Sequence, residues 1–264
     1  MVANKALGQH WLNNRVVLDD IAGLAAEGGA YDFAENRDKK RAKSMVPLCV
    51  EIGPGLGTLT ASLLRRFDKV LAVEFDEKLA RNLPGSFPGT NLEVINGDIL
   101  QFDFSKIKDK YVVAGNIPYY ITSPIIEKVL TATNVPERIV LLMQKEVAER
   151  IVDQKETLLS LFVKNRARAI AGPVVLKGEF TPPPKVDSQV VIFEPHAPIV
   201  GEEVFGLIRK GFAAPRKKLT HNLAGLKSRA ELIEIFKKLG ISENVRPGEI
   251  GLEKWDELYK AIYL

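Results

Sequence analysis

Short apolar runs alternate with amphipathic stretches between Val46 and Glu194. Each run is rich in Val, Ile or Leu and is too short for a helix: Leu48–Ile52, Val70–Val73, Leu92–Ile95, Tyr111–Ala114 and Ile139–Met143. Such runs, separated by helical segments, are typical of parallel strands that are buried on both faces of a sheet. The pattern therefore predicts an α/β fold built on a parallel sheet.

Two further apolar runs, Val174–Leu176 and Val190–Phe193, flank a proline-rich loop at residues 181–185. No helical pattern separates these runs, so we expect them to form a hairpin at the end of the sheet. Seven strands with a terminal hairpin fit an open, doubly wound, Rossmann-like sheet.

The character of the chain changes after the connector at residues 195–198, which has the sequence Pro-His-Ala-Pro. The remaining apolar residues recur at helical spacing in three segments, residues 202–212, 229–239 and 253–263. Glycine and proline separate these segments, as expected at helix ends. We therefore predict a sheet domain at residues 1–195 and a small helical domain at residues 196–264.

Positive charge is concentrated in two segments of the chain rather than spread evenly along it. The net charge is +4 and the pI about 9.0, which by themselves are weak signals of an anionic partner. Residues 205–230 contain no Asp or Glu, and we expect their basic side chains to bind RNA, chiefly Arg209, Lys210, Arg216, Lys217 and Lys218. A second basic cluster, residues 37–43, fits an RNA contact and a solvated surface equally well.

The compartment is predicted from cysteine content and from apolar segments. Cys49 is the single cysteine, and its place in an apolar run predicts a buried side chain. A lone thiol forms no internal disulfide, which favours a reducing compartment. Neither a signal peptide nor a membrane-length apolar stretch is present, so we expect a cytoplasmic protein.

The first chemical motif is Glu51-Ile52-Gly53-Pro54-Gly55-Leu56-Gly57, which follows a predicted strand and precedes a helix expected at residues 60–66. Glycines such as Gly53 and Gly55 let the backbone turn sharply and approach a ligand closely. Dinucleotide-binding loops have the spacing G-x-G-x-x-G, whereas here Gly57 comes one residue early. An acidic residue followed by G-x-G-x-G favours S-adenosylmethionine over NAD as the ligand.

The next two strand ends carry residues that suit a nucleoside. Glu74 lies about twenty residues after the glycine loop, where a carboxylate accepts both ribose hydroxyls, although NAD and S-adenosylmethionine share that ribose. Asp98 can accept a hydrogen bond from the adenine amine of the cofactor, and Ile99 can pack on its ring. Asp after Gly is also ordinary turn chemistry.

The motif that indicates the reaction is Asn116-Ile117-Pro118-Tyr119, directly after the fourth strand. The exocyclic nitrogen of adenine is a poor nucleophile, because its lone pair is delocalised into the ring. The side-chain oxygen of Asn116 and the backbone carbonyl of Ile117 or Pro118 can accept its hydrogens and direct the lone pair at a methyl donor. Pro118 stiffens the turn and Tyr119 can stack on the base.

The methyl donor is a sulfonium and already activated, so positioning and hydrogen bonding suffice, and no metal is needed. No Cys/His cluster with zinc spacing occurs in the sequence. Related Asn-x-Pro-Tyr motifs also serve methylation of glutamine and of DNA adenine. The motif therefore defines an amine or amide nitrogen as the acceptor more firmly than it defines RNA.

With these motifs the chain closely resembles the ribosomal RNA adenine dimethyltransferases, the kasugamycin-sensitivity methylases of bacteria. The resemblance runs from Leu7 to about Leu223 and rests on Gly8–Leu12, Glu51–Gly57, Asn116–Tyr119, Gln144–Arg150, Phe180–Ser188, Arg216–Leu219 and Asn222–Leu223. It implies a seven-stranded class I methyltransferase fold. It also implies N6,N6-dimethylation of two adjacent adenines near the 3′ end of 16S rRNA, during assembly of the small ribosomal subunit.

The resemblance also implies roles for individual residues. His10 and Leu12 belong to an N-terminal segment that covers the cofactor, while cofactor contacts are implied for Gly53, Glu74, Asp98 and Asn116. Phe180 looks like the aromatic residue that sandwiches the target base against Tyr119, and core packing at a strand end is its alternative interpretation.

The chain departs from the family pattern in three places. Trp11 replaces the usual Phe, and a charged segment at residues 30–45 stands where relatives pass quickly to the first strand. The stretch after Arg150 is shortened to Glu156–Ser160, which leaves the RNA contacts there open.

Two other functions remain open. A large-subunit (23S) adenine methyltransferase of the macrolide-resistance type shares the cofactor and base motifs, but the stretches Pro182–Ser188 and Arg216–Leu219 favour the small subunit. The protein can also act as an assembly factor that docks on the immature small subunit through residues 209–229. We expect a monomer whose partner is small-subunit rRNA, with no membrane contact.

Overall fold

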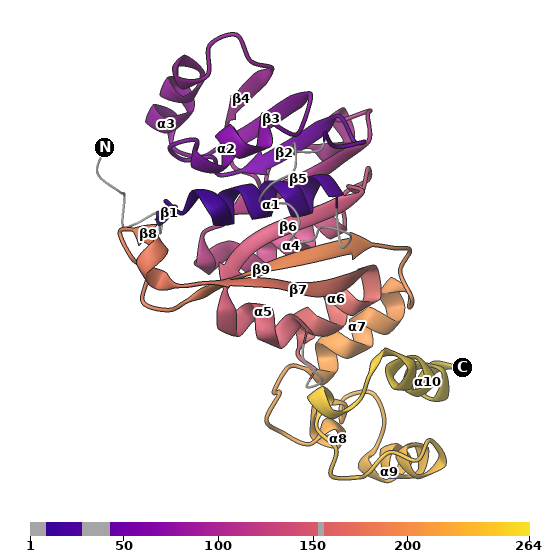
Figure 1. Ribbon diagram of the computed structural model, residues 1–264. Coiled ribbons are helices and arrows are strands. Elements are labelled where there is room, and N and C mark those ends of the chain that lie inside the picture. The colour runs from indigo at the N-terminus through magenta and orange to yellow at the C-terminus, as the bar shows by residue number, and fades with distance from the viewer. Residues whose placement is uncertain (1–8, 28–42, 153–155) are drawn as a thin grey trace. The chain divides into compact units, whose positions relative to one another are not determined.

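The computed structural model describes residues 9–27, 43–152 and 156–264, and Figure 1 shows its helices and strands. The second predicted basic cluster lies outside the described residues except for Lys43, which forms an ion pair with Asp68 at 3.3 Å. Among the described residues, no helix combines the length and apolarity that a membrane crossing requires.

A seven-stranded sheet forms the centre of the first part of the chain, in the order β4-β3-β2-β5-β6-β9-β7. Its strands are β2 (Leu48–Ile52), β3 (Lys69–Glu74), β4 (Leu92–Asn96), β5 (Tyr111–Asn116), β6 (Arg138–Gln144), β7 (Ala167–Val175) and β9 (Ser188–Pro195). The first five pair in parallel, and β9 is antiparallel to β6. The predicted α/β class and the five parallel strands are confirmed.

The register of the parallel strands brings their carboxyl ends to one edge of the sheet. Ile52 at the end of β2 pairs with Val73 on one side and Gly115 on the other, and Glu74 pairs with Asn96. The segments that follow these strands therefore meet at the same edge, which is where open α/β sheets bind ligands.

The end of the sheet differs in detail from the sequence prediction. β7 and β9 are neighbours there, as expected, but β7 begins at Ala167, well before the predicted run at Val174. Only the two end residues of β7 are buried, since the strand lies at the edge of the sheet, so its sequence shows no continuous apolar run. Pro173 fits such an edge, because proline cannot donate to a neighbouring strand.

Helices of this part of the chain are α1 (Arg15–Glu27), α2 (Thr58–Leu63), α3 (Glu77–Asn82), α4 (Thr122–Leu130) and α5 (Lys145–Val152). Short 3₁₀ turns occur at Leu83–Ser86, Phe104–Lys106, Tyr119–Ile121 and Lys177–Glu179. Helix α1 packs against α2 and across β5 and β6, and the apolar side chains of these elements join one buried cluster with Cys49. Asp76 begins α3 by accepting the N–H groups of Lys78 and Leu79.

A second, two-stranded sheet joins distant parts of the sequence. Strand β1 (Trp11–Leu12) is antiparallel to β8 (Phe180–Thr181), with Leu12 opposite Phe180. Asn13 strengthens the pairing, because its N–H donates to Glu179 and its side chain to Thr181. This small sheet fastens the N-terminal segment beside the carboxyl edge of the large sheet.

The chain divides into two compact units: residues 1–149 with 168–195, and residues 150–167 with 196–264. The second unit contains α6 (Leu158–Arg166), α7 (Glu202–Gly211), α8 (Leu219–Asn222), α9 (Arg229–Lys238), a 3₁₀ turn (Pro247–Glu249) and α10 (Leu252–Tyr263). A single boundary after residue 195 was therefore wrong for residues 150–167.

Helix α6 belongs to the second unit for a physical reason. Its Asn165 bonds twice to the backbone of Val200, accepting from the N–H at 2.8 Å and donating to the carbonyl at 3.2 Å. Phe162 of α6 meets Phe205 of α7 edge to face. These contacts join segments that are separated in the sequence by the strands β7 and β9, and no local sequence pattern predicts them.

Candidate active site

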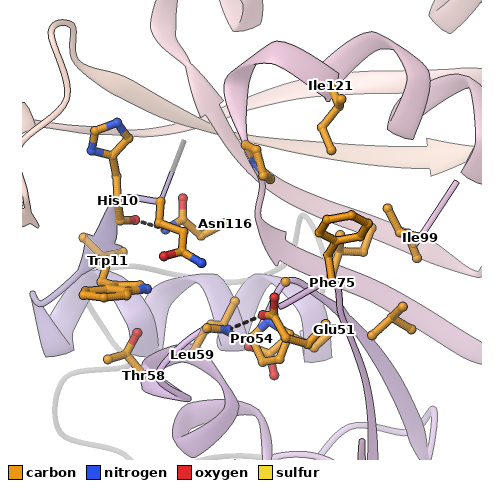
Figure 2. A pocket seen from close by; sticks show the side chains of 18 of the residues that line it. His10, Trp11, Glu51, Pro54, Thr58, Leu59, Phe75, Ile99, Asn116 and Ile121 are labelled. Carbon is orange, nitrogen blue, oxygen red and sulfur yellow. Dashed lines mark hydrogen bonds between the residues drawn. The ribbon is translucent and has the colours of Figure 1, made fainter. Parts of the chain in front are cut away.

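A cavity of about 250 Å³ opens at the carboxyl edge of the large sheet (Figure 2). Its lining brings together nine of the residues that the sequence singled out: His10, Leu12, Gly53, Gly55, Glu74, Asp98, Ile99, Asn116 and Pro118. They come from the ends of four parallel strands and from the N-terminal strand β1. Tyr119 and Phe180 are not among the described residues that line it.

The glycine loop between β2 and α2 turns through backbone conformations that favour glycine. Gly53, Gly55 and Gly57 have φ angles of 62°, 57° and 81°. At Gly55 an added Cβ would lie 3.0 Å from the indole nitrogen of Trp11, so the loop and the N-terminal strand touch here. Trp11 therefore lies against the glycine loop and forms part of the cavity wall.

Glu74 holds the glycine loop as well as facing the cavity. Its carboxylate accepts the N–H of Gly55 at 2.9 Å through one oxygen and the N–H of Asp76 at 2.8 Å through the other. Burial raises the pKa of Glu74, and the two N–H groups oppose that rise. A carboxylate has about four acceptor sites, so lone pairs remain for further donors from a ligand.

Glu51 is a second acidic group in the wall, at the end of β2. Its side chain is almost fully buried and accepts the hydroxyl of Thr60 at 2.6 Å. Burial raises the pKa of Glu51 to about 8, with the charge of Glu74 adding to the rise and the Thr60 hydroxyl opposing it. The carboxyl is therefore mostly protonated at neutral pH.

This raised pKa predicts a loss of stability as the pH rises. In the unfolded chain Glu51 ionises near pH 4.5, but in the folded protein it keeps its proton to about pH 8. The free energy of unfolding should therefore fall between those values, by a few kcal/mol at about 1.4 kcal/mol per pH unit. Urea unfolding across pH 5 to 9 measures it, and Glu51→Gln should flatten the profile. An equally steep profile in that variant would assign the effect to Glu74.

The opposite end of the cavity suits a flat purine. Asp98 accepts the N–H of Leu100 at 2.9 Å, so the turn interpretation of this residue holds, and it also lines the cavity. Ile99 and Phe75 lie on the side of the cavity away from His10 and Trp11 (Figure 2). Phe75 directly follows Glu74 and is 63% exposed, which leaves its ring face open to a planar ligand.

Asn116 has a defined orientation at the end of β5. Its side-chain nitrogen donates to the backbone carbonyl of His10 at 2.9 Å (Figure 2). Because a carbonyl only accepts, the NH₂ group must point at His10, and the side-chain oxygen is left as an acceptor. Of the two proposed backbone acceptors, the carbonyl of Pro118 receives the N–H of Ile121 at 3.3 Å and keeps a second lone pair, so both carbonyls remain candidates.

Tyr119 is held by one contact to its hydroxyl and by one contact to the face of its ring. Its hydroxyl is 2.7 Å from the hydroxyl of the buried Ser188 on β9, and its ring stacks with that of His10 at a centroid distance of 6.0 Å. Burial raises the pKa of Tyr119, so the phenol stays neutral.

Phe180 is buried in the apolar core, and its contact with the target base stays a prediction. It is 3% exposed and belongs to the apolar cluster beneath the sheet edge, opposite Leu12 in the small sheet. Core packing, the alternative interpretation from the sequence, describes the position of this side chain.

The lining residues that sequence reasoning missed include Glu51 as a buried acid, Phe75, Tyr120 and Trp11 as part of the wall. Phe75 could have been found, because it directly follows Glu74 at a strand end. Tyr120 is 62% exposed and follows the Asn-Ile-Pro-Tyr motif. Glu51 lies within the apolar run Leu48–Ile52, so the prediction that this strand is buried on both faces could have indicated its burial.

The predicted RNA-binding side chains are exposed within the second unit. Arg209 and Lys210 form the last turn of α7, and residues 216–218 lie in the segment that leads to α8. Arg209 stacks over Phe205 and lies 3.7 Å from Glu202, while Lys218 donates to Asn244. No group of three or more potential metal ligands occurs within the described ranges.

Comparison with known proteins places these features in one family. The family model for ribosomal RNA adenine dimethylase matches residues 2–263. A curated protein of Synechocystis, named ribosomal RNA small subunit methyltransferase A, is 36% identical, with 96% of this chain and 94% of that protein covered. A protein of the same name from Mycoplasma capricolum is 31% identical and covers 100% of this chain and 99% of its own length.

Solved structures agree in fold. The crystal structure of a dimethyladenosine transferase from Plasmodium falciparum is 26% identical, with a TM-score of 0.74 over 94% of this chain and 96% of that one. The crystal structure of the 23S rRNA methyltransferase ErmE has a TM-score of 0.71 over 96% of this chain and 100% of that one. At 22% identity, this second similarity shows the fold alone.

Proposed function

This chain belongs to the ribosomal RNA adenine dimethylase family, and on that basis we propose that it methylates adenine N6 in small-subunit rRNA with S-adenosylmethionine. The observation that carries the proposal is the hydrogen bond from the Asn116 amide to the His10 carbonyl, which leaves the Asn116 oxygen as an acceptor at the cavity. In line with the resemblance, the proposed product is N6,N6-dimethyladenine at two adjacent positions near the 3′ end of 16S rRNA. A ribosomal substrate of this kind would place the enzyme in the cytoplasm.

The cavity fits S-adenosylmethionine by the chemistry of its wall. Glu74 offers acceptors for ribose hydroxyls, and Asp98, Ile99 and Phe75 surround space for an adenine ring. The buried carboxyl of Glu51 lines the same cavity, and a positive charge on the methionine part would lower its pKa and favour the ionised form that balances this charge. When bound, S-adenosylmethionine supplies an activated methyl group on a sulfonium.

The residues of the chain then have to position and polarise the acceptor. The Asn116 oxygen and the backbone carbonyl of Ile117 or Pro118 accept hydrogen bonds from the adenine amine and direct its lone pair. Tyr119 is fixed by Ser188 and offers a ring face for the base. In the transfer the sulfonium would leave as a neutral thioether, and the alkylated nitrogen loses one proton to water. The nitrogen then carries a single hydrogen, so one of the two acceptors must tolerate a methyl group in the second transfer.

Methyl transfer to immature small subunits tests this function directly. Labelled S-adenosylmethionine should label adenines of small-subunit rRNA, and mass mapping should locate N6,N6-dimethyladenine at two adjacent positions near the 3′ end. Label in large-subunit rRNA, or macrolide resistance in a sensitive host, would instead support the 23S alternative. The small-subunit assignment is favoured by the names and coverage of the curated relatives.

Binding to the subunit is proposed to use the exposed cations of the second unit. Replacing Arg216 and Lys217 by alanine should weaken binding and reduce the slope of log affinity against log salt by about two. Lys237 and Lys238 at the end of α9 are a matched control with the same change in charge. Binding titrations at several salt concentrations measure both pairs, and an equal effect of both would assign the binding to net charge alone.

The same surface could support an assembly role that is separate from catalysis. A catalytically inactive variant that still restores subunit assembly would support that role, which is compatible with the enzymatic one. We also retain the prediction of a monomer, which sedimentation of the purified protein tests.

A further inference from the structure

A second cavity lies beside the cofactor cavity, between helix α3 and the N-terminal strand β1, and has a volume of about 360 Å³. The described residues that line it are Gln9, Trp11, Asp76, Lys78, Leu79, Arg81 and Asn82. Gln9 and Trp11 also line the cofactor cavity, so the segment that carries them separates the two spaces. The lining residues from α3 do not belong to the cofactor cavity.

Helix α3 brings two cations to this second cavity. Lys78 and Arg81 are exposed and lie three residues apart, which places them on one face of the helix, and Asn82 follows on the same face. Arg81 forms an ion pair with Glu77, but the two side chains are 71% and 70% exposed, and a pair in that setting contributes little. The guanidinium has five N–H donors, so donors remain for a ligand.

Asp76 supplies the carboxylate among the described residues of this lining, and that carboxylate is bonded to the helix. One of its oxygens accepts the N–H of Lys78 at 2.9 Å and the N–H of Leu79 at 3.2 Å, which begins α3. The two cations, Lys78 and Arg81, and this single carboxylate give the described lining a net charge of +1. The charge of the cavity therefore favours an anionic ligand.

The wall opposite the cations suits a planar group. Trp11 is half-buried and lies against the glycine loop, since a Cβ added at Gly55 would be 3.0 Å from its indole nitrogen. An aromatic ring of this kind stacks on any nucleobase. Gln9 and Asn82 carry amides, which both donate and accept hydrogen bonds and so match the edge of a base. Cations, amides and a flat ring together are the groups that recognise a nucleotide.

We propose that this cavity binds one phosphorylated nucleoside, with its phosphate on Lys78 and Arg81 and its base against Trp11. Small-molecule sites occupy about 300–1,000 Å³, and a cavity near the lower end of that range holds a single nucleotide. Two sources share this chemistry: a nucleotide within single-stranded RNA and a free nucleotide. The site goes beyond the proposed function, because neither the cofactor nor the methylated adenine occupies it. Trp11, which replaces the usual Phe of the family, supplies the stacking ring.

The test is calorimetric titration of the protein after saturation with S-adenosylmethionine, which keeps nucleotides out of the cofactor cavity. The ligands are UMP, inorganic phosphate and a short single-stranded oligouridine, none of which contains the adenine that the enzyme is proposed to methylate. UMP should bind about 5- to 150-fold more tightly than inorganic phosphate, because stacking of its base adds to the contacts of its phosphate.

Variants separate the contributions of the two walls. Lys78→Ala combined with Arg81→Ala should weaken UMP binding by at least about 10-fold, because hydrogen bonds from charged groups to the phosphate are lost. Trp11→Ala should weaken UMP binding about 5- to 150-fold without changing the affinity for inorganic phosphate. Trp11→Phe keeps an aromatic face and should recover most of that loss. Each variant is saturated with S-adenosylmethionine at a concentration set by its own Kd.

Lys106→Ala combined with Lys108→Ala is the matched control. Both lysines are exposed cations of the same compact unit, and neither lines either cavity. This variant should bind UMP as the wild type does, and thermal melting should show that every variant is folded. Equal weakening in both double variants would assign binding to net charge and overturn the proposal.

The comparison of ligands identifies the source of the nucleoside. Tighter binding of oligouridine than of UMP, with the additional affinity lost in the Lys78 and Arg81 double variant, would support a nucleotide of an RNA strand. Oligouridine binding no tighter than UMP would support a free nucleotide.

Three results would overturn the site itself. They are no binding of UMP to the saturated protein, displacement of UMP by further S-adenosylmethionine, and binding of inorganic phosphate as tight as that of UMP. Because every readout is an affinity, failure of this proposal would leave the proposed methyl transfer intact, and a failed methylation assay would leave this site intact.

Discussion

Replacing Asn116 with alanine should lower methyl transfer by at least about 100- to 1,000-fold while S-adenosylmethionine binding stays measurable. The side chain donates to the His10 carbonyl and presents its oxygen to the cavity, so alanine removes an acceptor that acts on the reacting amine. Loss of one preorganised hydrogen-bonding group of this kind costs about that factor in other enzymes. Incorporation of labelled methyl into immature small subunits gives the rate, and calorimetry gives the affinity.

Two variants make the result specific. Asn116→Asp keeps an oxygen but places a carboxylate against the His10 carbonyl, so it should also be strongly impaired. Asn134→Ala removes a similar amide-to-carbonyl bond, to Ile107 at 2.8 Å, from a position that is not part of the cavity lining. It should retain methyl transfer. Wild-type turnover in Asn116→Ala would refute the assigned role.

Replacing Glu74 with alanine should weaken S-adenosylmethionine binding about 10- to 150-fold. The substitution removes the acceptor for ribose hydroxyls and also leaves the N–H groups of Gly55 and Asp76 without their partner. Hydrogen bonds to a charged group contribute about 1.5–3 kcal/mol each, which corresponds to the stated range for the loss of one such bond to the ligand. Calorimetric titration with S-adenosylmethionine measures the change.

Two other glutamate substitutions serve as comparisons for Glu74→Ala. Glu74→Gln keeps one acceptor oxygen but turns an NH₂ group toward one of the two backbone N–H groups, so its loss should be intermediate. Glu93→Ala on the next strand removes a glutamate that pairs with Lys69 on the surface at 2.6 Å and should leave affinity intact. Unchanged affinity in Glu74→Ala would exclude the carboxylate from the cofactor site.

Motifs at strand ends were predictable because parallel topology forces them together. Gly53, Glu74, Asp98 and Asn116 follow four different strands, and the register of those strands places them around one cavity. The apolar runs predicted the strands, since a strand covered on both faces must be apolar throughout. Nothing more than strand order was needed to connect these residues.

Other features of the protein could be recognised only from the packing of side chains in the structure. Phe180 matched the expected motif, yet its ring lies in the core because β8 pairs with β1 and turns it inward. The grouping of α6 with the second unit depends on Asn165 and Val200, thirty-five residues apart.

By itself, the sequence determined the fold class and placed the glycine loop and the Asn-Ile-Pro-Tyr motif at the ends of strands, because these features depend on local spacing and on strand periodicity. Only the tertiary structure decided which way Asn116 points, that burial raises the pKa of Glu51, and that the ring of His10 stacks with that of Tyr119. Those properties arise from contacts between residues far apart in the chain. Burial and hydrogen-bond geometry determine these properties, and a sequence pattern does not contain that information.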